Sequence, residues 1–468
     1  MSKLANSLEE AIRSSGLKNG MTISFHHHLR NGDHVLNLVL DTIAKMGLTD
    51  ITVNASSLFD IHMPIIEHIK NGVVTGVETD YMSSALGREF SSGILKKPII
   101  FRTHGGRPSD IINGKSHIDV AFVAAPTSDD MGNCTGKIGK SACGSLGYAF
   151  ADAACADKVI VVTDNLVAYP LTDFSIAETC VDYVVQVPSI GDPRGIVSGT
   201  TTMTKDPIAL KIAKYAVKCI QASGLLKDGF SFQTGAGGAS LAAAAYLKDV
   251  MLEKKIKGSY VMGGITGYLV DMLEAGCFQA IMDVQCFDIK AINSLQNNPK
   301  HREVTAEHYA SPTAKSCIVD SLDAVILGAT EIDLNFNVNV HTDSNGYIMG
   351  GAGGHSDAAA GAKLAMIVAP LVRARVPIVC EKVQCISTPG STVDVLVTQR
   401  GIAVNPNRND LKELFKKAGL PVVSIEELYA KAKEIVGDYV PVQTSDKVIA
   451  KIIYRDGTEI DTIKQVKE

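Results

Sequence analysis

The sequence lacks the features that would place it in a membrane, in an oxidising compartment or on a nucleic acid. Its longest apolar run, LAMIVAPLV, has about nine residues, whereas a membrane-spanning helix needs roughly 20. The ten cysteines are scattered without any Cys-x-x-Cys pair, which is typical of buried thiols in a reducing compartment. The net charge is −5 and no long basic run occurs, so no nucleic-acid surface is expected. The amino terminus carries Glu9 and Glu10 and is not a secretory signal, so we predict a soluble cytoplasmic protein.

The standard nucleotide-binding motifs are also absent, although one segment is similar to them. GGAGGHSDAAAGAK, residues 350–363, clusters glycines ahead of a helical pattern, but Leu364 stands where a P-loop needs Ser or Thr. No well-placed acidic residue follows about twenty residues on, as a dinucleotide-binding fold requires. The glycines still allow the backbone to approach a ligand and to aim N–H groups at negative charge. The alternative interpretation is a packing turn in front of a helix.

The chain contains the same succession of segments twice. LKNGMTIS at residue 17 returns as LKDGFSFQ at residue 226. DVAFVAAPTSDDMGNCT from residue 119 aligns with DAVILGATEIDLNFNVN from residue 323, with Asn133 and Asn337 at the same step. DAACADKVIVV from Asp152 matches DAAAGAKLAMIV from Asp357. Three matches in one order, at offsets of about 204 to 209 residues, indicate a tandem duplication.

Within each copy, short runs rich in Val and Ile alternate with helical patterns. DITVNA, KPIIFRT, DKVIVVTD and VPIVCEKV are strand-like, and HVLNLVLDTIAKMG is helical. This alternation predicts an α/β fold with mostly parallel sheets covered on both faces. We place the division after the helix that ends near Gly224, so that residues 1–224 and 225–468 form two homologous domains. Because ligands bind at the carboxyl ends of parallel strands, the loops of both domains are expected to face a shared cleft.

Several segments together resemble the coenzyme A transferase superfamily, two-domain enzymes of the same tandem α/β build. QTGAGGA, residues 233–239, is similar to the glycine turn that opens the second domain of that family. EIDLNFNVN with GGAGGHSD is similar to its Val-Asp-Leu-x-Gly-x-Val-Asn strand and Gly-Gly-x-x-Asp-Phe loop. VTQRGIAV and APTSDDMGNC are similar to two further family segments. The resemblance covers nearly the whole chain, is closest to the citrate lyase α subunits, and implies two CoA-transferase-like domains.

One position departs from the ordinary members of that superfamily, which form a covalent acyl intermediate on the glutamate of a Gly-x-x-x-Glu segment. Here the matching stretch is GSYVMGGITG, residues 258–267, and Met262 stands at the glutamate's place. No acidic residue occurs between Lys257 and Asp271. The resemblance therefore implies a carrier-dependent transferase that works without a covalent glutamyl-enzyme.

The implied reaction moves the acyl carrier, or CoA, from an acetyl-thioester to citrate and releases citryl-thioester and acetate. No general base is required, because the carboxylate nucleophile is already charged and the leaving thiol has a pKa near 8.5. The resemblance also implies a β subunit (citryl lyase), a γ subunit (acyl carrier protein) and an oligomer. It implies no metal and no cofactor bound by this chain, because acetyl-CoA, or the carrier's CoA-like prosthetic arm, is substrate. Alternatives are citramalate as acceptor, another acyl-CoA transferase or hydrolase and, from another class, a sugar-phosphate isomerase or sensor.

The same loops supply the candidate site residues. Backbone donors for two successive oxyanions are expected from Gly235, Ala236, Gly237, Gly238, Gly353 and Gly354. Candidates for the substrate pocket are His26, His28, Arg30, Arg102, Arg107, His355, Asp357 and Arg400. Arginine binds carboxylates through two parallel hydrogen bonds, and citrate carries three carboxylates. On an extended strand His26 and His28 share a face that His27 does not, so a zinc site is one alternative for this pair. Asp357 is alternatively only the N-cap of the helix that follows.

One helical pattern offers a candidate surface for the carrier. Lys211, Lys214 and Lys218 are spaced at i, i+3 and i+7 and therefore share one helix face. Acyl carrier proteins are acidic whereas this chain is net negative, so docking requires a local basic patch. The alternative is an ordinary solvated helix face.

Overall fold

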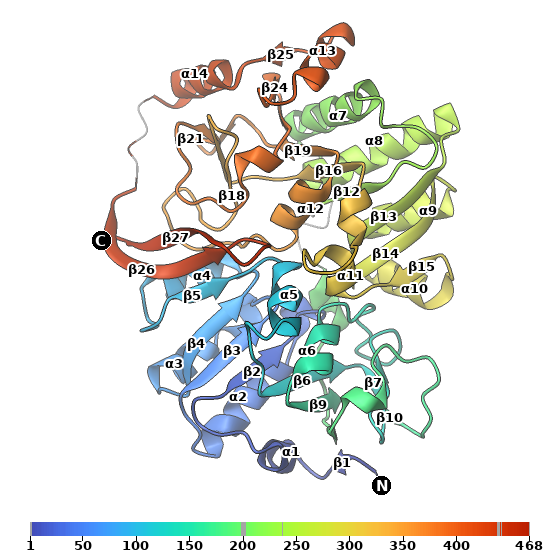
Figure 1. Ribbon diagram of the computed structural model, residues 1–468, viewed down its shortest axis with the longest axis vertical. Helices are drawn as coiled ribbons and strands as arrows, with labels where there is room; N and C mark the ends of the chain where they lie inside the picture. Colours follow the sequence, from blue (N-terminus) through green and yellow to red (C-terminus); the bar gives the residue numbers. More distant parts are fainter. Residues whose placement is uncertain (1, 198–202, 236, 438–439, 441, 468) are drawn as a thin grey trace.

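The computed structural model describes residues 2–197, 203–235, 237–437, 440 and 442–467, and two large sheets stack along its long axis (Figure 1). The first sheet runs in the order β1 (Leu4–Ala5), β11 (Tyr183–Gln186), β9 (Lys158–Thr163), β6 (Val120–Ala125), β2 (Thr22–Phe25), β3 (Ile51–Ala55), β4 (Val74–Thr79), β5 (Ile99–Phe101), β26 (Thr444–Ile453) and β27 (Glu459–Val466). The second runs in the order β15 (His301–Glu303), β14 (Phe278–Cys286), β13 (Gly258–Ile265), β12 (Phe232–Thr234), β16 (Ala324–Leu327), β19 (Leu364–Val368), β23 (Val395–Thr398), β24 (Gly401–Val404) and β25 (Val422–Val423).

Both sheets are built in the same order around an equivalent central strand. β2 lies between β6 and β3, and β12 lies between β16 and β13, with parallel pairing in every case. β6 is buried at every position, as expected for a parallel strand covered on both faces. The prediction of an α/β fold with mostly parallel sheets is confirmed. Antiparallel pairing within the large sheets joins β23 to β24 and β26 to β27.

Each unit also contains a small three-stranded sheet, and the two small sheets are alike. In the first unit β7 (Thr127–Asp129) pairs with β8 (Cys134–Thr135) and β10 (Leu166–Val167), and in the second β17 (Glu331–Asp333) pairs with β18 (Val338–Asn339) and β22 (Val379–Cys380). Asp129 accepts from the main-chain N–H of Asn133 at 3.0 Å, and Asp333 accepts from that of Asn337 at 3.0 Å. The two copies therefore close the same turn with the same pair of residues. A further short pair, β20 (Val372–Arg373) and β21 (Val376–Pro377), follows β19.

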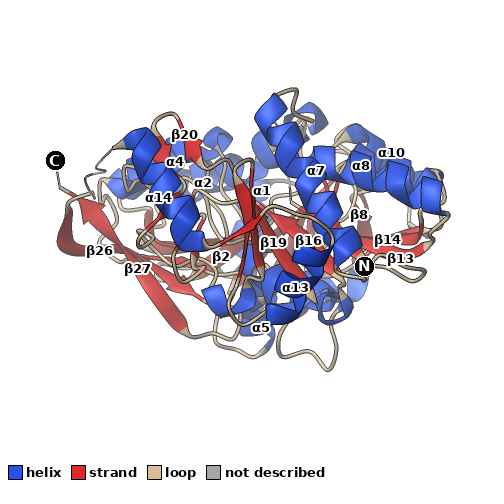
Figure 2. Ribbon diagram, turned by 90° about the horizontal axis from the view of Figure 1, so that it is seen from above, coloured by secondary structure: helices blue, strands red, loops and turns tan. Residues whose placement is uncertain are grey.

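Helices cover both faces of the sheets, as Figure 2 shows. The first unit contains α1 (Leu8–Ser15), α2 (Val35–Lys45), α3 (Ile65–Lys70), α4 (Ser84–Ser91), α5 (Gly106–Ile112) and α6 (Ala149–Cys155). The later helices are α7 (Pro207–Ala222), α8 (Gly238–Lys254), α9 (Gly267–Glu274), α10 (Ile289–Asn297), α11 (Ala306–Ala310), α12 (His355–Gly361), α13 (Asn409–Lys417) and α14 (Ile425–Val436). α7 starts where Asp206 caps the free N–H groups of Ile208 and Ala209 and Pro207 takes the first helical position. Among the described residues, no helix combines the length and the apolar character that crossing a bilayer demands.

The chain does not divide into two units between residues 224 and 225 as predicted. A segment from each side of that point packs with the other unit. α7 packs against α8, β19 and β23 of the second sheet, burying Ile212, Ala216 and Ile220. The hairpin β26–β27 leaves the second unit and pairs with β5, so it extends the first sheet (Figure 1). A bare edge strand exposes unpaired main-chain groups, and the returning hairpin satisfies those of β5. The helix joining the copies belongs to the second unit, and the last strands belong to the first.

Candidate active site

A cavity of about 400 Å³ lies where the carboxyl ends of strands from both units meet. The first unit contributes His27, Arg30, Ser57, Phe59, Tyr81, His104 and Tyr148. The second contributes Gln233, Thr234, Gly235, Gly264, Val284, Gln285, Phe287, Tyr309, residues 327–330, Val340 and residues 349–355. The expectation that the loops near Gly235 and Gly353 face one cleft together with the HHHLR segment is therefore met by the geometry. Of the predicted site residues, those on the wall are Arg30, Gly235, Gly353, Gly354 and His355.

Arg30 is the cation of the cavity wall. Its guanidinium lies over the rings of Phe59 and Phe287, with centroid distances of 5.4 and 4.8 Å. No carboxylate pairs with it among the residues that the structure describes, and its buried Nη1 has no hydrogen-bond partner there. Burial lowers the pKa of Arg30, yet an arginine stays charged in proteins. Its backbone has a φ of 51°, a strained value that the surrounding contacts must impose. The geometry suits an anionic ligand bound from the cavity side.

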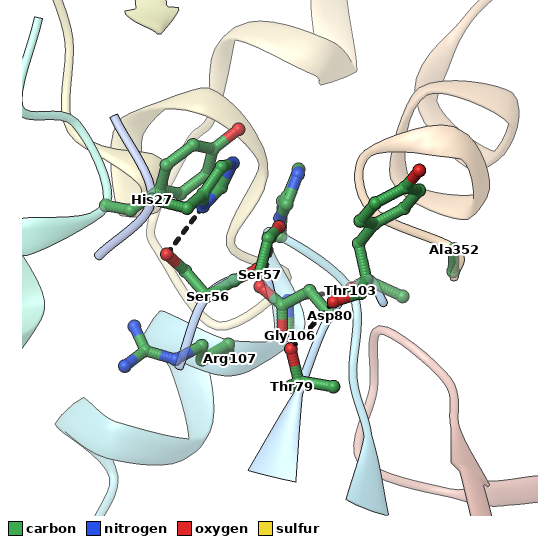
Figure 3. Close-up of polar contacts among 12 residues, drawn as sticks. His27, Ser56, Ser57, Thr79, Asp80, Thr103, Gly106, Arg107 and Ala352 are labelled. Carbon is green, nitrogen blue, oxygen red and sulfur yellow. Dashed lines mark hydrogen bonds and ion pairs between the residues drawn. The ribbon is translucent and has the colours of Figure 1, made fainter. Parts of the chain in front are cut away.

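The prediction that His26 and His28 face the cleft while His27 does not is wrong. β2 ends at Phe25, so the strand alternation on which the prediction depended stops before these residues. His27 lines the cavity, and its Nδ1 lies 2.7 Å from Ser56 Oγ (Figure 3). His26 and His28 lie behind the wall, with their Nδ1 atoms 2.7 Å apart. Burial lowers the pKa of His26 to about 4, so this ring is neutral at pH 7.

Those two rings give no support to the zinc alternative. Their Nδ1 atoms bond to each other, and neither ring belongs to a group of three potential metal ligands in the described part of the chain. The groups of that kind found there are two. One is Asp283, Cys286 and His301, fully buried, and the other is His117, Asp119 and Asp157, at the surface.

His104 is a wall residue that the sequence interpretation missed. Its Nδ1 lies 3.0 Å from Asp80 Oδ2, and burial raises the pKa of the Asp80 carboxyl. The ring packs against Tyr148 and His27, with centroid distances of 4.4 and 5.5 Å. Burial raises the pKa of Tyr148 well above its usual value, so it stays a neutral phenol. His104 thus presents its second nitrogen beside the glycine loop, held by one carboxylate and two rings.

Two of the expected oxyanion donors, the N–H groups of Gly353 and Gly235, are bonded within the fold. The N–H of Gly353 donates to Asp80 O at 3.1 Å, and that of Gly235 donates to Ile326 O at 2.9 Å. Both donors are therefore consumed by the fold. Gly237 and Gly238 line a separate cavity, and Ala236 lies outside the described residues.

The loop instead brings main chain close to other groups. A Cβ on Gly354 would lie 2.4 Å from the hydroxyl of Tyr309, which accepts from Gln233 Nε2 at 2.9 Å. Gly353 has a φ of +48°, and a Cβ there would lie 3.2 Å from His104 Nε2. Glycine is required at both positions because the backbone forms the wall.

His355 lines the cavity but is held by the protein on both ring nitrogens. Nδ1 lies 2.8 Å from Thr388 Oγ1, and Nε2 lies 2.8 Å from the carbonyl oxygen of Gly328. Burial lowers its pKa to about 4. A neutral ring that donates to a carbonyl and accepts from a hydroxyl positions the wall and has no proton to exchange near pH 7.

Four more predicted pocket residues lie elsewhere. Arg102 pairs with Glu78 at 2.6 Å and Asp110 at 2.9 Å, and Arg400 is exposed. Arg107 is buried in a two-pronged pair with Asp152, and its side chain points away from Ala352 in Figure 3. Asp357 is buried as well; it accepts from Thr103 Oγ1 and the Gly105 N–H, both at 2.9 Å. Its carboxylate joins the two units, so it does not cap α12 as the alternative had it.

The wall contains no aspartate or glutamate among the described residues. Met262, at the position where the resemblance puts the family's glutamate, is fully buried on β13 and does not line the cavity. The carboxylate on the neighbouring strand, Asp283, engages His301 at 2.8 Å and Cys286 at 2.9 Å. It is likewise absent from the wall.

Some missed residues left a signal in the sequence. His104 follows the strand-like KPIIF run, at the carboxyl end where ligands bind. In the same segment, RTHGGRP, the prediction chose Arg102 and Arg107 and passed over the histidine. Tyr148 stands four residues before Asp152, as Gly353 stands four before Asp357. The aromatic residues Phe59, Phe287 and Tyr309 carried no such signal, because only folding brings them together.

Fold and site together define a two-unit α/β protein with a cavity between the units, whose wall carries an arginine without a carboxylate partner among the described residues. The family model described as "Citrate lyase, alpha subunit" matches residues 1–466. The citrate lyase alpha chain of Klebsiella pneumoniae is 50% identical over 465 residues, covering 99% of this chain and 92% of that one. That of Escherichia coli is 47% identical over 466 residues, covering 100% and 91%. The chain belongs to the citrate lyase alpha subunit family.

Solved structures agree with this assignment. The putative alpha subunit of citrate lyase from Streptococcus mutans, solved in complex with citrate, is 51% identical with a TM-score of 0.98, covering 100% of this chain and 92% of that one. A malonate decarboxylase alpha subunit from Acinetobacter baumannii is 15% identical with a TM-score of 0.69, covering 94% and 93%. The second likeness concerns the fold alone.

Proposed function

We propose that this chain transfers the acyl carrier, or CoA, from an acetyl-thioester to citrate in the cavity between its units, without a covalent enzyme intermediate. The observation that carries the proposal is Arg30, a half-buried arginine on the wall whose buried Nη1 has no partner and which pairs with no carboxylate among the described residues. Its family, citrate lyase alpha subunits, supplies the substrate class. The S. mutans relative was solved with citrate bound.

Arg30 would hold one carboxylate of citrate through its forked N–H groups. The rings of Phe59 and Phe287 shield the pair from water, which strengthens the interaction. His104, whose Nδ1 lies 3.0 Å from Asp80 Oδ2, would contact a second carboxylate through Nε2. Two anchored carboxylates leave the third free to react.

The free carboxylate oxygen of citrate attacks the acetyl carbonyl carbon, and the C–S bond breaks to give a mixed anhydride and a thiolate. The thiolate then attacks the citryl carbonyl carbon of the anhydride and expels acetate. Each step exchanges one anionic oxygen or sulfur for another, so no proton is transferred. Positioning the carboxylate against the thioester can supply about 7–11 kcal/mol of the barrier reduction. With the Gly353 and Gly235 N–H groups already bonded, donors for the oxyanions would come from wall side chains such as His27 and Tyr148.

The absence of a carboxylate from the described wall supports a direct reaction over the glutamyl-enzyme route. It also weighs against the alternative of another acyl-CoA transferase or hydrolase, because Asp283, the carboxylate on the strand beside Met262, engages His301 and Cys286 and is absent from the wall. We propose further that the chain acts in a complex with the citryl lyase and acyl-carrier subunits and binds no cofactor of its own.

The test uses purified chain with labelled citrate and acetyl-CoA, and compares wild type with Arg30→Gln and Arg30→Lys. We expect citryl-CoA and acetate as products, and a KM for citrate raised roughly a hundredfold in Arg30→Gln, the scale of one lost buried charge contact. The matched control is Arg400→Gln, which removes an exposed arginine away from the cavity and should behave as wild type.

Intact mass after incubation with acetyl-CoA alone should show no added acetyl or CoA group. An adduct would contradict the direct mechanism. An unchanged KM for citrate in Arg30→Gln would remove Arg30 from the binding site.

A further inference from the structure

The outer face of α7 carries three cations without partners. Lys211, Lys214 and Lys218 are exposed on one side of the helix, and residues 207–222 contain no Asp or Glu. Among the described residues none of the three ammonium groups forms an ion pair. Lys211 lies over the ring of Tyr215 and Lys214 over that of Tyr246 in α8, each at 5.5 Å. Two of the three charges are therefore held over aromatic rings, and no described carboxylate neutralises any of the three.

Apolar side chains and a second cavity adjoin this face. Ile208, in the first turn of α7, is 45% exposed, and Met203 just before the helix is 37% exposed. The same first turns line a cavity of about 340 Å³, together with Gly238, Ser240 and Arg373. An exposed apolar contact beside fixed charges is the composition of a protein-docking surface.

The second cavity leads toward the first. Gly328 and Ala329 line both of them, at the end of β16. A Cβ on Gly328 would meet no other described atom within 4 Å, so no side chain crowds the shared wall at this residue. The two cavities are therefore neighbours that share part of one wall.

We propose that the α7 face, defined as Ile208, Lys211, Lys214 and Lys218, docks an acidic acyl-carrier protein, whose thioester arm passes through the smaller cavity and over Gly328 into the active site. The inference rests on the proposed function and adds the place where the carrier binds. The whole chain has a net charge of −5, so an acidic partner needs a local basic surface to be attracted.

The experiment compares transfer to citrate from two donors, the acetylated carrier protein and acetyl-CoA, which has a thioester arm but no protein. The variant is Lys211→Glu/Lys214→Glu. The matched control is Lys18→Glu/Lys45→Glu, which reverses two exposed lysines on the first unit and changes the net charge equally.

We expect the KM for the acetylated carrier to rise tenfold or more, the scale on which attraction between charged patches alters association rates. The KM for acetyl-CoA should match that of the control, and wild-type transfer from the carrier should weaken with added salt. If the variant does not fold, Lys211→Gln/Lys214→Gln carries the same test with a smaller expected rise.

Different results reject different claims. Wild-type chain that transfers from neither donor rejects the proposed function itself. Wild-type transfer from both donors with no selective rise for the carrier in the α7 variant rejects the docking surface alone. An equal rise for acetyl-CoA also rejects it, because the lysines would then act on the arm or the chemistry.

Discussion

Asp152 and Asp357 occupy equivalent positions in the two copies, but one bonds within its own unit and the other bonds to the opposite unit. Asp152 on α6 bonds Arg107 twice, at 2.8 Å each, within the first unit. Asp357 on α12 reaches out of its unit to Thr103 and Gly105, and also contacts Arg455 Nε at 3.4 Å in the turn of the returning hairpin. A duplication thus supplied two identical carboxylates. One holds its own unit together and the other fastens the two units beside the cavity.

The residues four positions earlier diverge in the same way. Tyr148 fills its side of the cavity with a ring that contacts His27 and His104. Gly353 presents bare backbone, and the N–H of His104 donates to its carbonyl oxygen at 2.8 Å. The first copy places an aromatic ring on the cavity wall and the second places only backbone there, so two similar units form an asymmetric pocket.

The largest effect should come from breaking the internal pair. Asp152→Ala leaves the buried Arg107 guanidinium without its partner, and we expect a loss of about 3–5 kcal/mol in the free energy of unfolding. Asp357→Ala should cost less, about 1–3 kcal/mol, because Arg455 is partly exposed and can turn to water. Urea unfolding of both variants measures the difference. Equal losses would mean that the two carboxylates are not used differently.

The glycine loop is the next place to test the asymmetry. Gly354→Ala would push Tyr309 and, through it, Gln233 on the wall, so we expect kcat/KM to fall roughly ten- to a hundredfold. Gly235→Ala should change the activation free energy by less than about 0.5 kcal/mol, because its nearest neighbour would be 3.6 Å away. Steady-state kinetics of the two variants decides the matter. Similar losses would show that the backbone of both turns is needed for catalysis.

The buried histidine pair makes the first unit sensitive to acid. The pKa of His26 is about 4 in the folded chain and about 6.5 in an unfolded one, so the unfolded state binds more protons between these values. The stabilising contribution of neutral His26 should therefore be fully present above about pH 6.5. Below that pH the free energy of unfolding should fall toward pH 4, by up to about 1.4 kcal/mol per pH unit from this group. His26→Asn should reduce that slope in urea titrations at several pH values. An unchanged slope would exclude His26 as a contributor.

The smallest effect is expected for His355. Since both its nitrogens are bonded to protein and its pKa is about 4, His355→Gln should lower kcat/KM no more than about tenfold. The pH–rate profile should keep its shape between about pH 5 and 8. A variant with no activity, or a wild-type profile with two limbs assigned to His355, would make this residue a proton-transfer group.

Local pattern was enough for the parallel α/β units, their repetition and the loops that meet at the cleft. Those features depend on apolar runs, glycines and caps that act over a few residues, such as Asp206 ahead of α7 and the turn at Asp129. The family resemblance likewise rested on short segments, and it pointed to Met262 as a lost acid.

Which partner each side chain binds was decided by contacts between residues that are distant in the sequence. Arg30, Arg102 and Arg107 look alike in the sequence, but only Arg30 remains without a carboxylate among the described residues, because Glu78, Asp110 and Asp152 reach the other two. The N–H of Gly353 lost its expected role to Asp80, some 270 residues earlier in the sequence. The hairpin β26–β27 joined the first sheet because the free edge of β5 could be satisfied there. Each outcome is a competition among partners that become neighbours only after folding, and no periodicity or motif records which partner wins.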